Sequence, residues 1–246
     1  MLSSKSALIR EMFSSIAPRY DFLNHFLSLN VDKRWRKMAV ALMRERVVAD
    51  HPLCLDLCCG TGDLSLEMRR QGIPTVVSCD FSRPMLELNR EKVRGSGNDR
   101  SIFLVEGDAL ALPFPSRIFD GVVIGFGLRN LDDAAQGLAE MKRVLKPGGI
   151  LAILEFSKPS NPWFDRLFQL YFFKVLPQIG NRISKHNHAY GYLPASVRLF
   201  PSQLELKKIL QDSGFAEIGF CNLTGGIAAV HYGTRVMVDR EHHFQV

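Results

Sequence analysis

A short loop with two glycines and an acidic flank is the first segment whose residue types could bind a ligand. It reads LDLCCGTGD over residues 55–63, where Gly60 and Gly62 allow the backbone to turn tightly and approach a ligand. Asp80 lies twenty residues after Gly60, at the end of the next apolar run. A carboxylate in that place can accept hydrogen bonds from ribose hydroxyls. The spacing predicts a site for an adenosine-bearing cofactor.

The charge of this loop selects the cofactor. A dinucleotide site uses a third glycine and leaves a helix amino terminus open for pyrophosphate, but Ser65 occupies that position and carboxylates flank the loop. Carboxylates repel phosphate, whereas S-adenosylmethionine carries a sulfonium and an ammonium and has no phosphate. We therefore predict S-adenosylmethionine, with Asp108 placed to accept from the adenine amino group. The expected cofactor contacts are Asp56, Gly60, Thr61, Gly62, Asp80, Asp108 and Ala109.

Cysteines crowd the same region, at Cys54, Cys58, Cys59 and Cys79. A structural zinc site needs four ligands, usually in paired CxxC or Cys/His units, and no second unit of that kind is present. The odd total of five cysteines also makes a disulfide framework implausible. We expect reduced thiols, no metal, and a cytoplasmic location.

Alternating strands and helices must position the loop. The sequence predicts strands over residues 53–57, 75–80, 101–105, 119–124 and 150–156, separated by helices, and then a helix over 202–213 followed by strands over 215–223 and 227–238. Thr224-Gly225-Gly226 joins the last two strands as a hairpin. The continuous apolar strands indicate a sheet covered on both faces. The expected fold is α/β: a doubly wound, mostly parallel seven-stranded sheet with one antiparallel edge strand, preceded by amino-terminal helices.

Aromatic residues are concentrated late in the chain. Seven of the 24 aromatic residues fall between Phe156 and Phe173. Phe164, Phe168 and Phe172 belong to an apolar stripe at helical spacing, which suits either an isoprenoid lipid or a protein core. Both interpretations stay open.

Overall composition excludes several classes of protein. The chain of 246 residues is 46% hydrophobic and 23% charged, which is typical of a soluble globular domain and not of disorder or coiled coil. No apolar run reaches the length of a membrane-spanning helix, and the amino end does not resemble a secretory signal. The net charge of +6 permits an anionic membrane surface as a partner without requiring it.

Several motifs, in the right order, resemble one family: the ubiquinone/menaquinone biosynthesis C-methyltransferases, which are class I S-adenosylmethionine-dependent enzymes. The resemblance runs from about Phe13 to Thr234. The matching segments are YDFLN at 20–24 with Ser28 and Trp35, GLRN at 127–130, RVLKPGG at 143–149 with EFS at 155–157, YGYLPAS at 190–196 with Phe200 and Pro201, and NLTGG at 222–226 with His231.

The resemblance implies methylation of a ring carbon on a polyprenylated benzoquinol or naphthoquinol, with demethylmenaquinol favoured. It points to Arg129 and Asn130, which follow the fourth strand. Arg129 would stabilise a phenolate or position a water, with His231 or Asp21 as the base. The substrate contacts we expect are Tyr20, Phe164, Phe168 and Tyr192. The partners expected are the quinol and the membrane surface. A homodimer is allowed, and no nucleic acid is expected.

The order of the predicted elements divides the chain into a helical cap or lid at residues 1–49, a methyltransferase domain at 50–238 and a tail at 239–246. Within the cap, Asp32 is expected to cap a helix with an apolar face. The sequence also departs from the family pattern, which has His at Asp32, commonly Ser at Gly125, and often an acidic residue at Ala195. Gly125 can therefore offer a cofactor no side-chain contact.

A methyltransferase that acts on another small molecule or on nucleic acid is the first alternative function. Amino-methylating nucleic-acid enzymes have an Asx-Pro-Pro-aromatic motif after the fourth strand, and this chain has GFGLR at 125–129. A non-enzymatic, cofactor-binding assembly factor for a quinone-synthesising complex is the second alternative. Retention of Arg129 and Asn130 argues against it, and turnover by purified protein decides it.

Overall fold

The structure is a computed structural model that describes residues 9–12, 14, 21, 25, 28–98, 100–159, 162–170 and 187–237. Side chains at positions 164, 167, 168 and 187–191 are outside this description. The helices are α2 (Val31–Arg44), α3 (Asp63–Arg70), α4 (Arg83–Gly95), α5 (Ala134–Val144), α6 (Pro162–Leu170), α8 (Asn187–Leu199) and α9 (Gln203–Asp212), with short 3-10 turns η1 (Leu128–Asn130) and η3 (Thr224–Gly226).

One seven-stranded sheet organises the chain. Its strands are β1 (Leu53–Leu57), β2 (Thr75–Asp80), β3 (Ile102–Glu106), β4 (Phe119–Gly125), β5 (Leu145–Phe156), β6 (Phe215–Leu223) and β7 (Ala228–Arg235). They are arranged in the order β3-β2-β1-β4-β5-β7-β6. The first five strands pair in parallel, and β7 runs antiparallel to both of its neighbours. The predicted fold class is confirmed.

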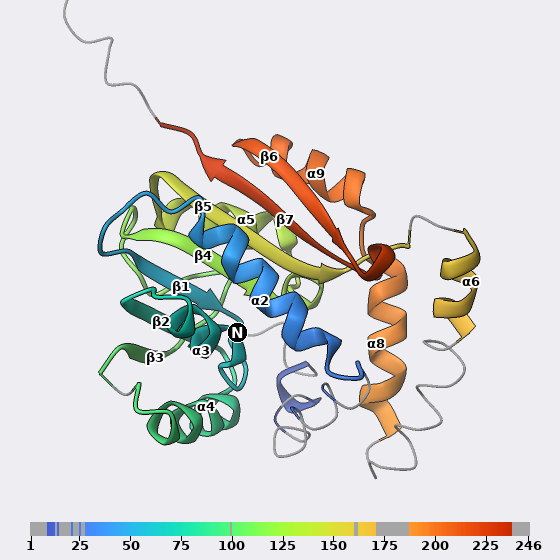
Figure 1. The fold of residues 1–246 in the computed structure, drawn as a ribbon, viewed down its shortest axis with the longest axis horizontal. Coiled ribbons are helices and arrows are strands. Elements are labelled where there is room, and N and C mark those ends of the chain that lie inside the picture. Colours follow the sequence, from blue (N-terminus) through green and yellow to red (C-terminus); the bar gives the residue numbers. More distant parts are fainter. Residues whose placement is uncertain are drawn as a thin grey trace, which may run out of the picture.

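The antiparallel strand lies one place inside the sheet, because the short connection at η3 folds β6 and β7 into a hairpin. β7 then pairs with β5, and β6 takes the edge. The predicted hairpin is therefore confirmed. Figure 1 shows β6 and β7 crossing the top of the sheet, with α6 and α8 beyond the end of β5.

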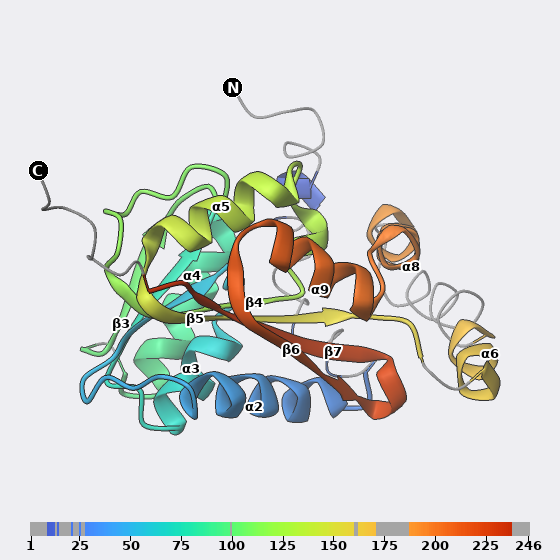
Figure 2. The same ribbon diagram turned by 90° about the horizontal axis from the view of Figure 1, so that it is seen from above.

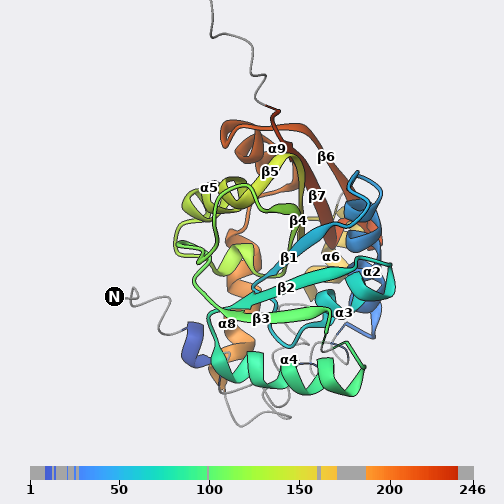
Figure 3. The same cartoon turned by 90° about the vertical axis from the view of Figure 1, so that its left-hand side faces the viewer.

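Helices cover the sheet on two sides. In Figure 2, α2 and α3 lie along one face and α5 and α9 along the other. The pleat of β1 explains both layers, because successive side chains point to opposite faces. Leu55 packs in the cluster that contains Leu138 of α5, whereas Cys54 packs in the cluster that contains Met43 of α2. Figure 3 shows α4 beside the β3 edge.

The amino-terminal boundary of α2 differs from the prediction. The helix begins at Val31 with Asn30 in the N-cap position, so the prediction that Asp32 caps it is wrong. Asp32 instead lies in the first turn, buried, where it accepts a hydrogen bond from Ser28 and pairs with Arg36 one turn later. A carboxylate near a helix amino terminus is also favoured by the helix dipole.

The strand order places a crevice at the carboxyl ends of β1 and β4. The chain moves outward from β1 to β2 and β3 on one side, and from β4 to β5 on the other. The loops that follow β1 and β4 therefore diverge, and ligands of open α/β sheets bind at such a switch point. Among the described helices, none is both long and apolar enough to span a membrane.

Candidate functional site

A pocket of about 760 Å³, measured out to its open mouth, lies at this switch point. It is lined by four of the predicted cofactor residues, Gly60, Asp80, Asp108 and Ala109, and by Asn130. Asp56, Thr61 and Gly62 are not part of its lining. The loop that was predicted from sequence thus meets the ends of β2, β3 and β4 in one place.

Asp80 fixes the shape of the loop. One carboxylate oxygen accepts a hydrogen bond from the backbone N–H of Gly60 at 2.8 Å, and the other accepts one from the backbone N–H of Ser82 at 2.8 Å. Burial raises the pKa of Asp80 to about 6, against the lowering effect of these backbone donors. Each oxygen has a further lone pair, so the carboxylate can also accept from a ligand hydroxyl in the pocket.

Asp56 lies beneath the loop and supports it from the sheet side. It is fully buried and accepts a hydrogen bond of 2.5 Å from the hydroxyl of Ser65, which also contacts the hydroxyl of Ser78 at 2.6 Å. Desolvation raises the pKa of Asp56 to about 7. Alternation along β1 explains this position, because Leu55 and Leu57 point to the opposite face.

The second glycine of the loop needs its missing side chain. Gly62 has a φ of 86°, in the left-handed region that favours glycine. A Cβ at this position would collide with the side chain of Asn89 on α4. Gly62 therefore shapes the loop through close packing against α4, without itself lining the pocket.

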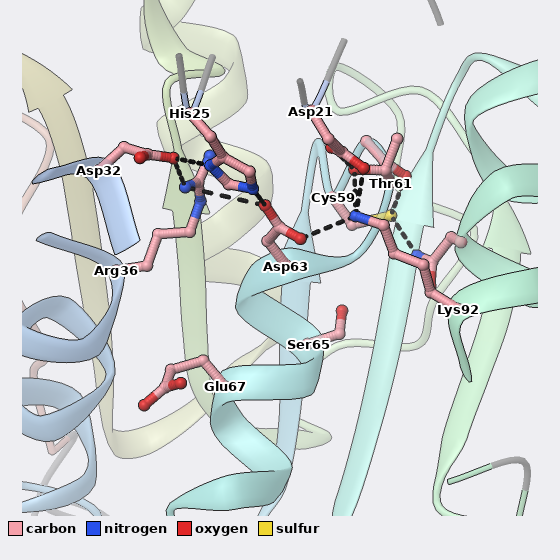
Figure 4. Close-up of polar contacts among 12 residues, drawn as sticks. Asp21, His25, Asp32, Arg36, Cys59, Thr61, Asp63, Ser65, Glu67 and Lys92 are labelled. Carbon is pink, nitrogen blue, oxygen red and sulfur yellow. Dashed lines mark hydrogen bonds and ion pairs between the residues drawn. The ribbon is translucent and has the colours of Figure 1, made fainter. Parts of the chain in front are cut away.

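A network of charged groups joins the amino-terminal segment to the glycine loop (Figure 4). The ammonium of Lys92 contacts the carboxylates of Asp21 at 2.5 Å and Asp63 at 2.8 Å, and donates to the hydroxyl of Thr61 at 3.0 Å. Thr61 donates to Asp21 at 2.5 Å. Asp21, predicted as an alternative base, is thus placed on the outer side of the loop by two partners.

The other half of this network centres on Asp63. His25 lies between Asp32, at 2.7 Å, and Asp63, at 3.6 Å, while Arg36 pairs with Asp32 and lies 3.8 Å from Asp63. The Arg36 guanidinium, helped by the hydrogen bond from Ser28 at Asp32 and by the Lys92 ammonium at Asp63, outweighs burial and lowers the pKa values of Asp32 and Asp63. The charge of Asp63, on one side of the acidic loop, is therefore largely neutralised by Arg36 of α2 and Lys92 of α4.

Arg129 is held in a buried ion pair. Its side chain is 7% exposed, and its guanidinium lies 2.5 Å from the carboxylate of Glu155, whose side chain is 1% exposed. The same guanidinium donates to the backbone carbonyl of Phe126 at 2.6 Å and lies over the ring of Phe156. Burial raises the pKa of Glu155 to about 7, against the lowering effect of Arg129. Sequence reasoning singled out Arg129 but not its partner.

Asn130 and Tyr192 form further hydrogen bonds next to the Arg129–Glu155 ion pair. Asn130 donates to the same carbonyl of Phe126 at 3.1 Å, and its amide oxygen accepts from the hydroxyl of Tyr192 at 3.0 Å. Tyr192 comes from α8, so this contact joins residues 62 positions apart. The structure thereby brings Arg129, Asn130 and Tyr192 together beside the pocket.

His231 lies elsewhere. It is buried on β7 against the ring of Phe220, and its Nε2 contacts the backbone carbonyl of Gln203 at 3.0 Å. Desolvation lowers the pKa of His231. His231 does not line the pocket.

Three predicted substrate contacts cannot be placed. Tyr20 lies outside the described residues. Phe164 and Phe168 belong to helix α6, but the structure describes only their backbone and not their side chains.

Sequence reasoning missed several residues at the site. Phe81, Met85 and Ile9 also line the pocket. A bulky apolar residue directly after Asp80 was a usable signal for Phe81, whereas nothing local marks Ile9. The cysteine thiols nearby are protonated, since burial raises the pKa of Cys79 to about 12.

Comparison with known proteins agrees with this geometry. Residues 1–235 match the model of the ubiE/COQ5 methyltransferase family. The chain belongs to this family. The family resemblance and the dependence on S-adenosylmethionine that were predicted from the sequence are thereby confirmed.

Relatives match over most of their length. The ubiquinone/menaquinone biosynthesis C-methyltransferase UbiE of Geobacter sulfurreducens is 47% identical, over 95% of this chain and 91% of that protein. The demethylmenaquinone methyltransferase of Thermus thermophilus is 45% identical, over 91% of this chain and 100% of that protein.

Solved structures share the fold at lower identity. A methyltransferase from Thermotoga maritima, described as a possible histamine N-methyltransferase, has a TM-score of 0.64 at 20% identity and covers 92% of this chain and 98% of its own. At that identity the likeness concerns the fold alone.

Proposed function

We propose that this protein transfers a methyl group from S-adenosylmethionine to a ring carbon of a polyprenylated quinol. Demethylmenaquinol, which becomes menaquinol, is the favoured substrate, and the benzoquinol precursor of ubiquinone is the second. The observation that carries the proposal is the 45% identity, over nearly full length, to the protein named demethylmenaquinone methyltransferase. The polar group formed by the buried Arg129–Glu155 pair and Asn130 supports the proposal chemically.

Carbon methylation needs an electron-rich ring and correct alignment. The cofactor supplies an electrophilic methyl on its sulfonium, and Asp80, Gly60 and Asp108 are the residues placed to hold it. Transfer of the quinol hydroxyl proton to solvent water moves negative charge onto the ring and its neighbouring carbon, and after methylation that carbon loses its own proton so that the ring is aromatic again. A fixed guanidinium beside that oxygen stabilises the developing phenolate more than the neutral quinol.

Glu155 positions Arg129 for this role. The pair is buried, so the guanidinium cannot rotate into solvent without leaving a carboxylate in the protein interior. Asn130 is oriented by Tyr192 and by the carbonyl of Phe126, and it lines the cofactor pocket. We therefore assign phenolate stabilisation to Arg129 and ring orientation to Asn130. Neither Asp21 nor His231 is assigned as the base, because both are engaged away from the pocket lining.

A lipid substrate requires access to a membrane. On α6, Trp163 is 77% exposed and Leu170 is 50% exposed, and the guanidinium of Arg166 lies over the Trp163 ring. Exposed Trp with a neighbouring cation suits the interface between headgroups and acyl chains. We include peripheral membrane contact through α6 in the proposal.

The test is methyl transfer by purified protein. Reduced demethylmenaquinone and S-adenosylmethionine should give menaquinol, identified by the mass of one added methyl group. A deletion strain should accumulate the unmethylated quinone. Purified protein that binds S-adenosylmethionine but methylates neither quinol would favour the assembly-factor alternative.

A further inference from the structure

A second cavity lies behind the cofactor pocket, between η1, α5, α8 and α9. It encloses about 830 Å³ out to its mouth, within the range of small-molecule sites. Its walls are mostly apolar and include Leu128, Leu138, Leu206 and Ile209. A cavity of this composition suits a hydrocarbon chain.

Two polar side chains of this cavity lie beside the cofactor pocket. Arg129 and the ring of Tyr192 belong to the cavity lining, and Tyr192 donates its hydrogen bond to Asn130, which lines the cofactor pocket. Leu131 lines both spaces. The two therefore share a wall, and an amphipathic ligand lying across it would place its polar ring by Arg129 and its apolar part in the cavity.

The mouth of the cavity suits entry from a lipid surface. Leu199 is 86% exposed and lines the cavity, and it also lines an adjoining surface groove together with Lys158, Arg198 and Lys208. Apolar side chains among basic ones are the pattern that favours a bilayer with anionic headgroups. Glu205 and Asp212 also line this groove, so its charge is mixed with a basic excess.

We propose that the cavity between η1, α5, α8 and α9 binds the isoprenoid tail of the quinol. The inference rests on the proposed function and extends it with a tail site that is separate from the aromatic helix α6. The occupant is the hydrocarbon chain, because apolar walls, a polar inner end and a lipid-facing mouth occur in that order. Tail binding then contributes to affinity in proportion to the apolar surface that is buried.

The test uses substitutions that fill the cavity with larger side chains from two of its walls, α5 and α8. Ala134 on α5 lines the cavity, whereas the next residue, Ala135, is exposed, so Ala134→Leu and Ala135→Leu add the same atoms inside and outside. Ser196→Leu fills the cavity independently from α8. Each protein is assayed with demethylated naphthoquinols that carry either no tail or a geranylgeranyl tail, in the same detergent micelles. Calorimetry with geranylgeraniol measures tail binding without turnover.

We expect Ala134→Leu and Ser196→Leu to raise the KM for the geranylgeranyl quinol about tenfold, which corresponds to about 1.4 kcal/mol, and to leave the tail-less quinol unchanged. Geranylgeraniol should bind to wild type and Ala135→Leu but not to the filled variants. Binding of S-adenosylmethionine and the melting temperature show which variants are folded. If one filled variant does not fold, the other carries the test.

The outcomes separate the two proposals. If wild type turns over the quinols and the filled variants change the KM equally for both quinols, or change neither, the tail site is overturned while the proposed function stands. Binding of geranylgeraniol that depends on positions 134 and 196, without turnover of either quinol, supports the tail site and overturns quinol methylation. Geranylgeraniol binding that is unchanged in both filled variants also overturns the tail site.

Discussion

Arg129 and Glu155 form an ion pair that is almost completely buried, with 2.5 Å between guanidinium nitrogen and carboxylate oxygen. Arg129 comes from the turn after β4 and Glu155 from the end of β5, so pairing of these neighbouring parallel strands brings the two charges together. The pair links stability to the proposed chemistry, because a buried charge that loses its partner is costly.

Arg129→Met should lower both stability and turnover. The variant leaves Glu155 without its cation, so the free energy of unfolding at pH 7 should fall by about 3 to 5 kcal/mol. Loss of the phenolate-stabilising donor should reduce kcat by roughly 100- to 1000-fold. Denaturant unfolding and steady-state kinetics at saturating quinol measure the two effects.

The double variant Arg129→Met/Glu155→Gln separates these effects. It removes both charges, so it should recover much of the lost stability without recovering turnover. Full recovery of kcat in the double variant would show that Arg129 acts only on the fold.

Asp80 should couple cofactor affinity to pH. Its native pKa is raised to about 6 by burial, and its ionised form is the one that accepts from ribose hydroxyls. Affinity for S-adenosylmethionine should therefore fall as pH drops below about 6, by up to about tenfold per pH unit. Calorimetry across pH 5 to 8 should show this fall in wild type, with no such step in Asp80→Asn.

Asp80→Ala should weaken binding at pH 7 on the order of 10- to 150-fold, since it removes a charged acceptor. Unchanged affinity in a folded Asp80→Ala variant would contradict the ribose contact.

Asp56 should make stability fall as pH rises. Its native pKa, raised by burial to about 7, lies above the ordinary aspartate value of 3.8, so the native state binds more protons than the unfolded state between about pH 4 and 7. The contribution of Asp56 to the free energy of unfolding therefore decreases across this window. The difference in free energy of unfolding between Asp56→Asn and wild type should therefore shift in favour of the variant by up to about 4 kcal/mol between pH 4 and 7.

Unfolding by urea at both pH values measures that gain. Asp133→Asn is the matched control, because Asp133 is exposed at the amino end of α5. The same pH-dependent gain in Asp133→Asn, or none in Asp56→Asn, would contradict the role of burial.

Lys92 should hold the segment before α2 against the glycine loop. Lys92→Met leaves Asp21 and Asp63 without their shared cation, so amide exchange at Asp21 and His25 should accelerate by about tenfold, while exchange in the sheet stays unchanged. Exchange measured by mass spectrometry tests this, with Lys33→Met as a control on the exposed side of α2. Equal exchange in both variants would show that the Lys92 network does not order this segment.

Local patterns in the sequence determined the sheet and the place of the cofactor site. Buried parallel strands are continuous apolar runs in the sequence. A tight turn is indicated by Gly60 and Gly62, and an acidic strand end by Asp80. The distance between these two features depends only on one strand-helix-strand unit, which is local in sequence. The predicted strands therefore coincide with β1 and β2 at both ends, and Gly60 and Asp80 meet in one hydrogen bond.

Only the tertiary structure decided which charges pair and which faces are buried. Asp56 points beneath the loop because of the strand pleat, His231 contacts Gln203 because α9 packs over β7, and Lys92 reaches Asp21 across 71 positions of sequence. Tyr192 reaches Asn130 only because α8 returns to the end of the sheet. These contacts depend on register and on the packing of distant segments, which no local periodicity encodes, and they determine what Arg129, Asp21 and His231 can do.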